Sequence, residues 1–295
     1  MKLDNGLRRE IDALPLYPEK DMPTSLGKWY GFLNAITRHL RVEGPEGFLC
    51  WDVIRETMFV RDAFAPYIAE ELAYLQGRDD WQGRFSEALR ESELGEPEPC
   101  ALLPWSSCNL IHHAYSAAQF ESRAGIRISQ LDAVFEFGGG YGSMCRLFRN
   151  LGFAGRYIIY DFPVLSLLQR LYLSGIGMTL RRPGQDGAGV VCVFSVEDLR
   201  QALADVRPGG RNLFLATWSL SEAPVAVRDM VSKLLDPFCH FMLAAQDTFQ
   251  EVDNVAYFTH FMEQHVDVQW SCWPIAHLPG NRYIMGRPCS PASKN

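Results

Sequence analysis

The sequence predicts an α/β fold with a mostly parallel, seven-stranded sheet that follows an α-helical region. Up to about residue 130, apolar residues recur at helical spacing. From residue 131, short β-like runs alternate with helical ones, as in successive βαβ units. In addition, an apolar run at 134–137 passes directly into glycines and then into a helical stretch, which is typical of a ligand-binding strand–loop–helix.

Four helical segments are expected in the first 130 residues. The first three are indicated by apolar residues three and four positions apart, in the ranges 29–40, 48–58 and 68–75. The fourth begins at Ser106 or Ser107, either of which can cap it, and continues towards Arg123. Before it, Gly95 and two prolines predict a loop over 91–99.

Seven strands and five helices are expected in the second half of the chain. The strands are Ala133–Phe137, Tyr157–Tyr160, Val190–Phe194, Leu213–Thr217, His240–Ala244, Val266–Trp270 and Arg282–Met285. The helices are Met144–Leu151, Pro163–Ser174, Val196–Leu203, Glu222–Leu235 and Val255–Gln264. The loop before the last strand, with Pro279 and Gly280, is too short for a parallel crossover. An antiparallel hairpin is therefore expected to close the sheet.

The chain of 295 residues is long enough for one large domain or two ordinary ones. Residues 131–295 suffice for the α/β domain, and residues 1–130 form an additional helical region. This region is expected to supply a lid over the active site, part of a ligand pocket or the interface of a homodimer.

Composition and charge exclude several classes of protein. Hydrophobic residues make up 47% and charged residues 21% of the chain, which excludes a disordered, collagen-like or coiled-coil protein. The formal net charge is -7, so nucleic acid is not an expected partner. No apolar stretch approaches the ~20 residues that span a bilayer, and the first 20 residues lack the apolar core of a signal peptide. The eight cysteines include no CxxC pair, so we expect reduced thiols and a cytoplasmic protein.

The segment 134–142 carries the strongest functional signal. Its glycines permit positive φ and a close approach of the backbone to a ligand, and the helix that follows offers free N–H groups to an anionic group. A dinucleotide fingerprint would require a glycine where Ser143 stands, and the spacing is instead Glu-x-Gly-x-Gly-x-Gly. The candidate ligand-binding residues are Glu136, Gly138, Gly139, Gly140, Tyr141 and Gly142.

A second acidic residue stands where a nucleoside-binding fold needs one. Asp161 follows the apolar run 157–160 and lies 19 residues beyond Gly142, which leaves room for one helix and a turn. A carboxylate at the end of this strand can accept two hydrogen bonds from a ribose diol. The two acidic positions together predict a nucleoside-containing cofactor.

With these motifs the chain resembles class I S-adenosylmethionine-dependent methyltransferases. The string Tyr-Asp-Phe-Pro-Val-Leu at 160–165 is similar to a segment of small-molecule O-methyltransferases, and the combined pattern over 138–173 is most like the bacterial sugar O-methyltransferases. The resemblance covers about residues 105–288. It implies a Rossmann-like sheet, S-adenosyl-L-methionine as cofactor and S-adenosyl-L-homocysteine as product.

The resemblance also implies further cofactor contacts, from Phe162, Ser195, Val196, Thr217 and Trp218. Trp218 is equally consistent with an ordinary core aromatic residue. The alternative to a methyltransferase is a Rossmann-like domain that holds NAD or another nucleotide, or none.

The expected reaction requires alignment of the acceptor with the methyl group, and it also benefits from a general base. Methyl transfer is an in-line displacement, but an alcohol must also lose its proton, for which a general base contributes ~10²–10⁴-fold. In plant-type enzymes the base is a histidine after the fourth strand, where this chain has Ser221, so Glu222 becomes a candidate base. Glu222 is equally consistent with a first-turn helix residue that follows a Ser221 cap. His112 and His113 are the other candidates, and because adjacent helix positions are ~100° apart we expect at most one to face the methyl group.

The candidate substrate-binding residues are Tyr115, Ser219, Asp247 and Asn254. Asp247 follows the fifth strand at the edge where ligands bind open α/β sheets. Asp253 and Asn254 are also consistent with a helix cap. No compact carboxylate cluster is present, so no metal is expected.

The expected function is transfer of a methyl group to a hydroxyl of a small molecule or sugar. The chain lacks the Asn-Pro-Pro-Tyr segment of enzymes that methylate amino groups of nucleic acids, which agrees with its acidic charge. The alternatives are N-methylation of a specialised metabolite and an inactive cofactor-binding subunit.

Overall fold

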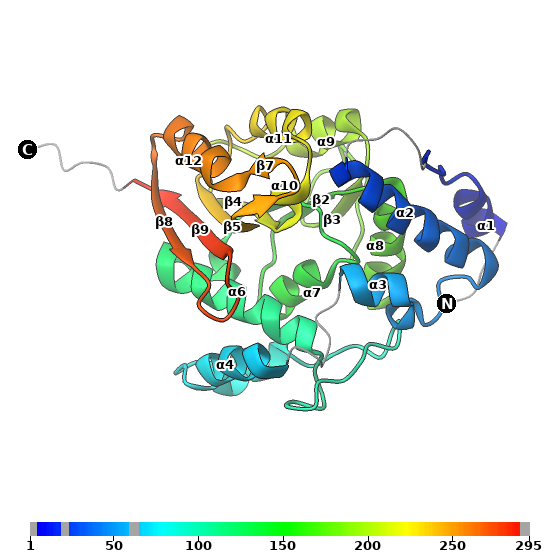
Figure 1. Ribbon diagram of the computed structural model, residues 1–295, viewed down its shortest axis with the longest axis horizontal. Helices are drawn as coiled ribbons and strands as arrows, with labels where there is room; N and C mark the ends of the chain where they lie inside the picture. Colours follow the sequence, from blue (N-terminus) through cyan, green and yellow to red (C-terminus); the bar gives the residue numbers. More distant parts are fainter. Residues whose placement is uncertain (1–4, 19–23, 59–64, 290–295) are drawn as a thin grey trace, which may run out of the picture.

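A seven-stranded sheet forms the centre of the structure, a computed structural model that describes residues 5–18, 24–58 and 65–289 (Figure 1). In chain order its strands are β1 (Ala133–Phe137), β2 (Arg156–Tyr160), β3 (Gly189–Val193), β4 (Asn212–Thr217), β5 (His240–Gln246), β8 (Val268–Pro274) and β9 (Asn281–Pro288). They lie side by side in the order β3-β2-β1-β4-β5-β9-β8. Strands β1 to β5 are parallel, and β9 is antiparallel to both β5 and β8. The Rossmann-like sheet and its closing antiparallel hairpin are therefore confirmed.

The central strands are apolar on both faces because helices cover both. All five residues of β1 are buried; Val134 packs into the core on one face, and Phe135 and Phe137 pack into the core on the other. Such continuous burial is usual for parallel strands between two helix layers.

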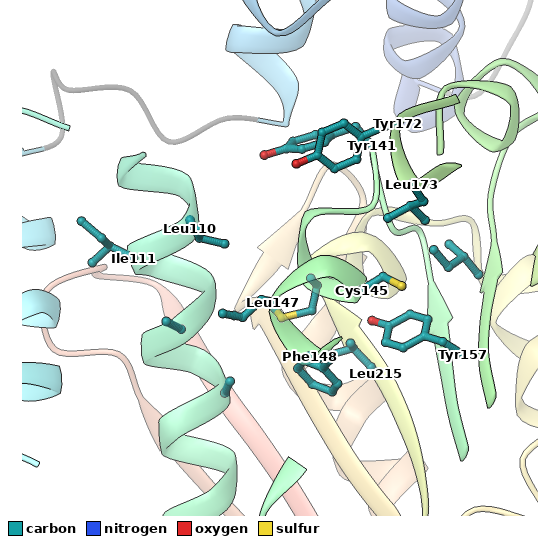
Figure 2. Packing of buried hydrophobic residues seen from close by; sticks show 14 of the residues in the cluster. Leu110, Ile111, Tyr141, Cys145, Leu147, Phe148, Tyr157, Tyr172, Leu173 and Leu215 are labelled. Carbon is teal, nitrogen blue, oxygen red and sulfur yellow. The ribbon is translucent and has the colours of Figure 1, made fainter. Parts of the chain in front are cut away.

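Helices α6 (Cys108–Ala124), α7 (Ser143–Asn150) and α8 (Pro163–Gly175) cover one face of the sheet. Helices α9 (Val196–Leu203), α11 (Val225–Ser232) and α12 (Asn254–Gln264) cover the other. Figure 2 shows Leu147 of α7 between α6 and the sheet, and Phe148 beside Tyr157 and Leu215. The rings of Phe148 and Tyr157 meet edge to face with centroids 5.9 Å apart. Helix α7 is thus wedged between α6 and the strands.

The first half of the chain is helical, as predicted. It contains α1 (Asn5–Asp12), α2 (Thr24–Val42), α3 (Asp52–Thr57), α4 (Ala65–Gln76) and α5 (Ser86–Ala88). Helices α2, α4 and α6 confirm three of the four expected helices, and Ser107 caps α6 by accepting from the Leu110 N–H at 3.1 Å. The stretch 91–99 is irregular, as expected. None of the helices within the described ranges is long and apolar enough to cross a membrane.

Two expected helices are interrupted in the structure. The expected helix over 48–58 is a short 3-10 turn, Phe48–Cys50, followed by α3, because Trp51 between them is extended (φ −66°, ψ 133°). The expected helix Glu222–Leu235 is divided into α10 (Ser219–Glu222) and α11. Ala223 is extended there because it precedes a proline.

Several smaller elements also differ from the expectation. The last two strands are shifted or longer, since β8 begins at Val268 and β9 extends to Pro288. A two-stranded ribbon of β6 (Thr248–Phe249) and β7 (Val252–Asp253) was not expected. Asp253 caps α12 by accepting from the Ala256 N–H at 3.0 Å, so the capping interpretation of that aspartate is confirmed.

The helical region and the sheet share one hydrophobic core. Ile11, Leu33 and Leu72, from α1, α2 and α4, belong to the same cluster of buried residues as Leu110 and Val134. The change of pattern near residue 130 therefore does not coincide with a break in the core. The division into 1–130 and 131–295 remains a prediction.

Because the core is shared, we expect one cooperative thermal transition for the whole chain. Leu33→Ala, at a fully buried position of α2, should lower the free energy of unfolding by ~2–5 kcal/mol and shift that single transition. The matched control is Val42→Ala on the same helix, where the side chain is 82% exposed and little change is expected. Calorimetry checks this, and a separate early transition in Leu33→Ala would contradict it.

Candidate active site

A cavity of about 600 Å³ opens at the carboxyl ends of β1, β2 and β4. Ligand pockets commonly measure roughly 300–1,000 Å³. Strand β1 lies between β2 and β4. The strand order therefore runs in one direction from β1 to β3 and in the other from β4 onward, and open α/β sheets bind ligands at such a point. The wall is made by the glycine loop, by helices α6 and α10, and by the N-terminal helices α2, α3 and α4.

The glycine loop has no room for side chains. At Gly138 (φ +73°) an added Cβ would lie 2.4 Å from the Cβ of Ser219, and at Gly139 it would lie 2.6 Å from Cγ2 of Ile159. The hydroxyl of Ser219 donates to the carbonyl oxygen of Phe137, which holds α10 against the loop. The same glycines line the cavity, so a ligand can approach the backbone of the loop directly.

Glu136 lies buried beneath this loop with 4% of its surface exposed. Its Oε2 accepts a hydrogen bond from the Tyr157 hydroxyl at 2.8 Å. Burial raises the pKa of Glu136 to about 8, although the Tyr157 bond opposes the shift. The carboxyl group is consequently protonated through most of the neutral pH range.

Asp161, directly after β2, is held by three donors. Its Oδ1 accepts from the Phe162 N–H at 2.8 Å, and its Oδ2 accepts from the Gly140 N–H and the Gln169 amide, each at 3.0 Å. Burial nevertheless raises the pKa of Asp161 to about 7. The carboxyl group is thus fixed in orientation at the pocket wall and would become easier to ionise if a ligand donated to it.

Other expected cofactor residues lie on or near this wall. Gly140, Tyr141, Phe162 and Thr217 line it, whereas Gly142 (φ +97°) lies behind it as the cap of α7. Ser195 and Val196 were also expected to contact the cofactor, but the structure places both outside the cavity wall. Ser195 caps α9 through the Asp198 N–H, and neither it nor Val196 lines the cavity. The preceding Phe194, 50% exposed, lines it instead.

Trp218 stands in a strained conformation at the centre of the wall. Its φ is +63°, which for a bulky residue costs about 1–3 kcal/mol. Its N–H donates to the Ala244 carbonyl at 2.7 Å, and its indole donates to Oδ1 of Asn281 at 2.7 Å. Its ring centroid lies 5.1 Å from that of His112. Strand ends from β4, β5 and β9 therefore hold the ring in the cavity.

His112 is one of two histidines bound to the same buried carboxylate. Oε1 of Glu71, on α4, contacts Nδ1 of His112 at 2.7 Å and Nε2 of His277 at 2.8 Å. Glu71 is fully buried, which disfavours its charge, but the two imidazoles hold its pKa below the usual value. Nε2 of His112 is left for the cavity, which His112 lines. A carboxylate at Nδ1 fixes the tautomer and orientation of an imidazole.

His113 also lines the cavity but has different partners. Its Nδ1 lies 3.2 Å from the Ser143 hydroxyl. Burial and the neighbouring His112 lower the pKa of His113 to about 3, so it is neutral at physiological pH. Of the two adjacent histidines, only His112 has a carboxylate partner among the described residues.

Glu222 ends the short helix α10 and lines the cavity. Its Oε1 accepts from the Gln246 amide at 2.7 Å. Burial raises the pKa of Glu222, while hydrogen bonds from Gln246 and from the indole of Trp29 lower it. Trp29 belongs to α2, so the N-terminal region contacts a predicted catalytic residue directly.

Three of the four expected substrate residues lie outside the cavity wall, and only Ser219 lines it. Asn254 is buried and accepts from the buried guanidinium of Arg228 at 2.7 Å. Asp247 accepts from Arg282 at 2.7 Å. Tyr115 packs its ring against the His277 ring, with centroids 5.4 Å apart.

The sequence predicted that the helical region could contribute to a pocket, but it did not identify the residues of that region that line the cavity. Tyr30 of α2 packs edge to face on Phe162, with centroids 6.5 Å apart, beside Asp161. Glu56 and Met58 from the end of α3, and Tyr67 from α4, complete this side. Aromatic residues at helical spacing are usual for a core, so the sequence offered no signal that separates these residues from core positions.

Within residues 5–18, 24–58 and 65–289, no three or more His, Cys, Asp or Glu side chains are grouped so that they could hold a metal ion.

No protein-family model and no curated protein matches the sequence. Solved structures do match, and three methyltransferases are among them. A precorrin-6y C5,15-methyltransferase from Geobacter metallireducens has 16% identity and a TM-score of 0.40, covering 68% of this chain and 96% of its own. A magnesium protoporphyrin IX methyltransferase from Synechocystis, solved with bound S-adenosylmethionine, has 10% identity and a TM-score of 0.39, covering 78% and 95%. A mitomycin 7-O-methyltransferase has 10% identity and a TM-score of 0.37, covering 97% and 76%.

The buried Glu136 predicts a measurable dependence of stability on pH. Its pKa is about 8 in the folded chain and near 4.5 when unfolded, so the unfolded state ionises first and stability falls as pH rises from about 4.5 to about 8. Glu136→Gln removes this loss while its carbonyl still accepts from Tyr157.

The stability of Glu136→Gln relative to the wild type should therefore be ~1–3 kcal/mol greater at pH 8 than at pH 6. Chemical denaturation at the two pH values measures this gain. An equal difference at both values would contradict the buried, protonated state of Glu136, and Glu197→Gln, at an exposed position, is the control.

Proposed function

We propose that this chain is an S-adenosylmethionine-dependent methyltransferase that methylates a hydroxyl of a small molecule or sugar. One observation carries the proposal. A single cavity joins a glycine loop without room for side chains, a fixed carboxyl group at the end of β2, and an imidazole held by a buried carboxylate. The first two features suit a nucleoside cofactor, and the third suits removal of a proton from an acceptor.

The residues present fit this cofactor. Gly138, Gly139 and Gly140 all line the cavity, so their backbone is open to a ligand. Asp161 is placed to accept from a ribose diol, and Phe162 and Phe194 offer aromatic surfaces for a base. When bound, the cofactor supplies a methyl group activated by a sulfonium centre.

His112 is the base that the geometry favours. In this assignment its Nδ1 hydrogen is donated to Glu71, which leaves the lone pair of Nε2 to accept the hydroxyl proton of the acceptor. Glu71 then stabilises the imidazolium that forms, and His277 shares the same carboxylate oxygen. His113 is neutral and bound to Ser143, so we assign it no proton-transfer role.

The N-terminal helices supply a further part of the cavity wall. Trp29, Tyr30 and Tyr67 reach the wall from α2 and α4. In this proposal they form the acceptor pocket, which accounts for the helical region that cofactor binding alone does not require.

Cofactor binding is the first test. Calorimetry should show binding of S-adenosylhomocysteine but not of NAD, and Asp161→Asn should weaken that binding at least tenfold, because a charged acceptor for the ribose diol is lost. Since binding needs the ionised form of Asp161, the affinity should also fall as pH drops below about 7. Asp247→Asn, outside the cavity, is the control. Absence of binding at millimolar ligand would refute the proposed function.

The acceptor is first found by mass spectrometry, as the compound in an extract that gives a product one methylene heavier. The base assignment is then tested with this acceptor. His112→Asn keeps a donor near Glu71 but removes Nε2, and it should lower kcat by ~10²–10⁴ with little change in cofactor affinity. Glu71→Gln should lower kcat and alter the pH–rate profile, whereas His113→Gln should change kcat only a few-fold. A larger loss in Glu222→Gln than in His112→Asn would show that Glu222 is the base. A methylated nitrogen in the product would favour N-methylation.

A further inference from the structure

We propose that the acceptor carries a protonated amine that pairs with Glu222, and that it bears neither phosphate nor carboxylate. The inference rests on the proposed function, because it concerns the acceptor side of the same cavity. It narrows the acceptor from small molecules in general to amine-bearing ones with a flat or apolar body.

The described part of the wall disfavours an anionic acceptor. Among its described residues the wall contains four carboxyl groups, those of Glu56, Glu136, Asp161 and Glu222, and no lysine or arginine. Glu136 and Asp161 belong to the cofactor side, so Glu56 and Glu222 remain for the acceptor. A phosphate or carboxylate there would meet like charge in a partly enclosed, apolar site, which weakens its binding.

Glu222 lacks a cationic partner at close range. Its hydrogen-bond donors, the Gln246 amide and the Trp29 indole, are both uncharged, and no described residue forms a salt bridge with it. The exposed Lys28 adds only a longer-range attraction. Burial raises the pKa of this carboxyl group, as expected where a counter-charge is missing. A ligand ammonium group would supply that counter-charge.

The aromatic lining of the cavity suits the same group. Trp29 donates to Glu222 and also lines the cavity, as do Tyr30, Tyr67 and Trp218. Aromatic faces attract cations through their quadrupole, and they also pack on flat apolar bodies. An acceptor with an ammonium group at Glu222 would therefore be covered by rings.

The positions of anchor and base agree with this assignment. The Glu222 N–H donates to the Trp218 carbonyl at 3.1 Å, and the Trp218 ring lies 5.1 Å from the His112 ring. Trp218 thus contacts both residues, Glu222 through its backbone and His112 through its ring. An amine held at Glu222 would leave the other end of the same molecule, with its hydroxyl, facing His112.

A series of three phenols tests the proposal, because they share one skeleton and differ in the charge of its end. Tyramine ends in an ammonium, tyrosol in a hydroxyl and 4-hydroxyphenylacetate in a carboxylate. Their dissociation constants would be measured by ligand-observed NMR on the full chain saturated with S-adenosylhomocysteine. Tyramine should bind at least tenfold more tightly than tyrosol, and 4-hydroxyphenylacetate should bind most weakly.

Glu222→Gln provides the decisive comparison. It should bring tyramine to within about threefold of tyrosol, whereas Glu197→Gln, with an exposed side chain outside the cavity, should leave the tenfold preference intact. Thermal melting verifies that both variants are folded.

Three results would overturn the inference: equal binding of tyramine and tyrosol, tightest binding of 4-hydroxyphenylacetate, or no binding of any probe at millimolar concentration. If S-adenosylhomocysteine still binds in these cases, only the acceptor assignment fails. If it does not bind, the proposed function itself fails.

Discussion

One oxygen atom, Oε1 of Glu71, accepts hydrogen bonds from the imidazoles of His112 and His277. The three residues come from α4, from α6 and from the loop between β8 and β9, so this pair of hydrogen bonds joins the first half of the chain to the last hairpin of the sheet. A carboxylate this deeply buried is tolerated only with such donors, since removing one would leave charge unpaired. The position of His112 in the cavity, and with it the proposed chemistry, depends on this junction.

Burial raises the pKa of each carboxyl group in and beside the cavity, and the donors decide the net direction of the shift. Glu71, with two imidazoles, has a lowered pKa, whereas the pKa values of Glu136 and Asp161 rise to about 8 and about 7. Asp161 keeps a raised value although two backbone N–H groups and an amide donate to it, because all three donors are uncharged. The cavity therefore holds carboxyl groups poised to change charge when a ligand arrives, beside one that stays ionised.

The sequence was most informative where structure is local. The strand, glycine and helix order of 134–150 and the spacing to Asp161 follow from short-range rules, and the structure places both at one cavity. The expected helix Glu222–Leu235 was wrong at one local position, because Ala223 precedes Pro224 and such a residue avoids helical geometry. Glu71 and His277 could not be predicted as partners, since they are 206 positions apart and only tertiary packing brings them together. For the same reason Trp29 could not be assigned to Glu222.

The order of the strands has a consequence for how the site is completed during synthesis. Strand β9 leaves the ribosome last of the seven, yet it inserts between β5 and β8 and brings Asn281 to the indole of Trp218. The glycine loop and Asp161 can be assembled from β1 and β2 much earlier. By contrast, the part of the wall that holds Trp218 and His112 is complete only when the last hairpin of the chain is in place, because Asn281 and His277 both belong to it.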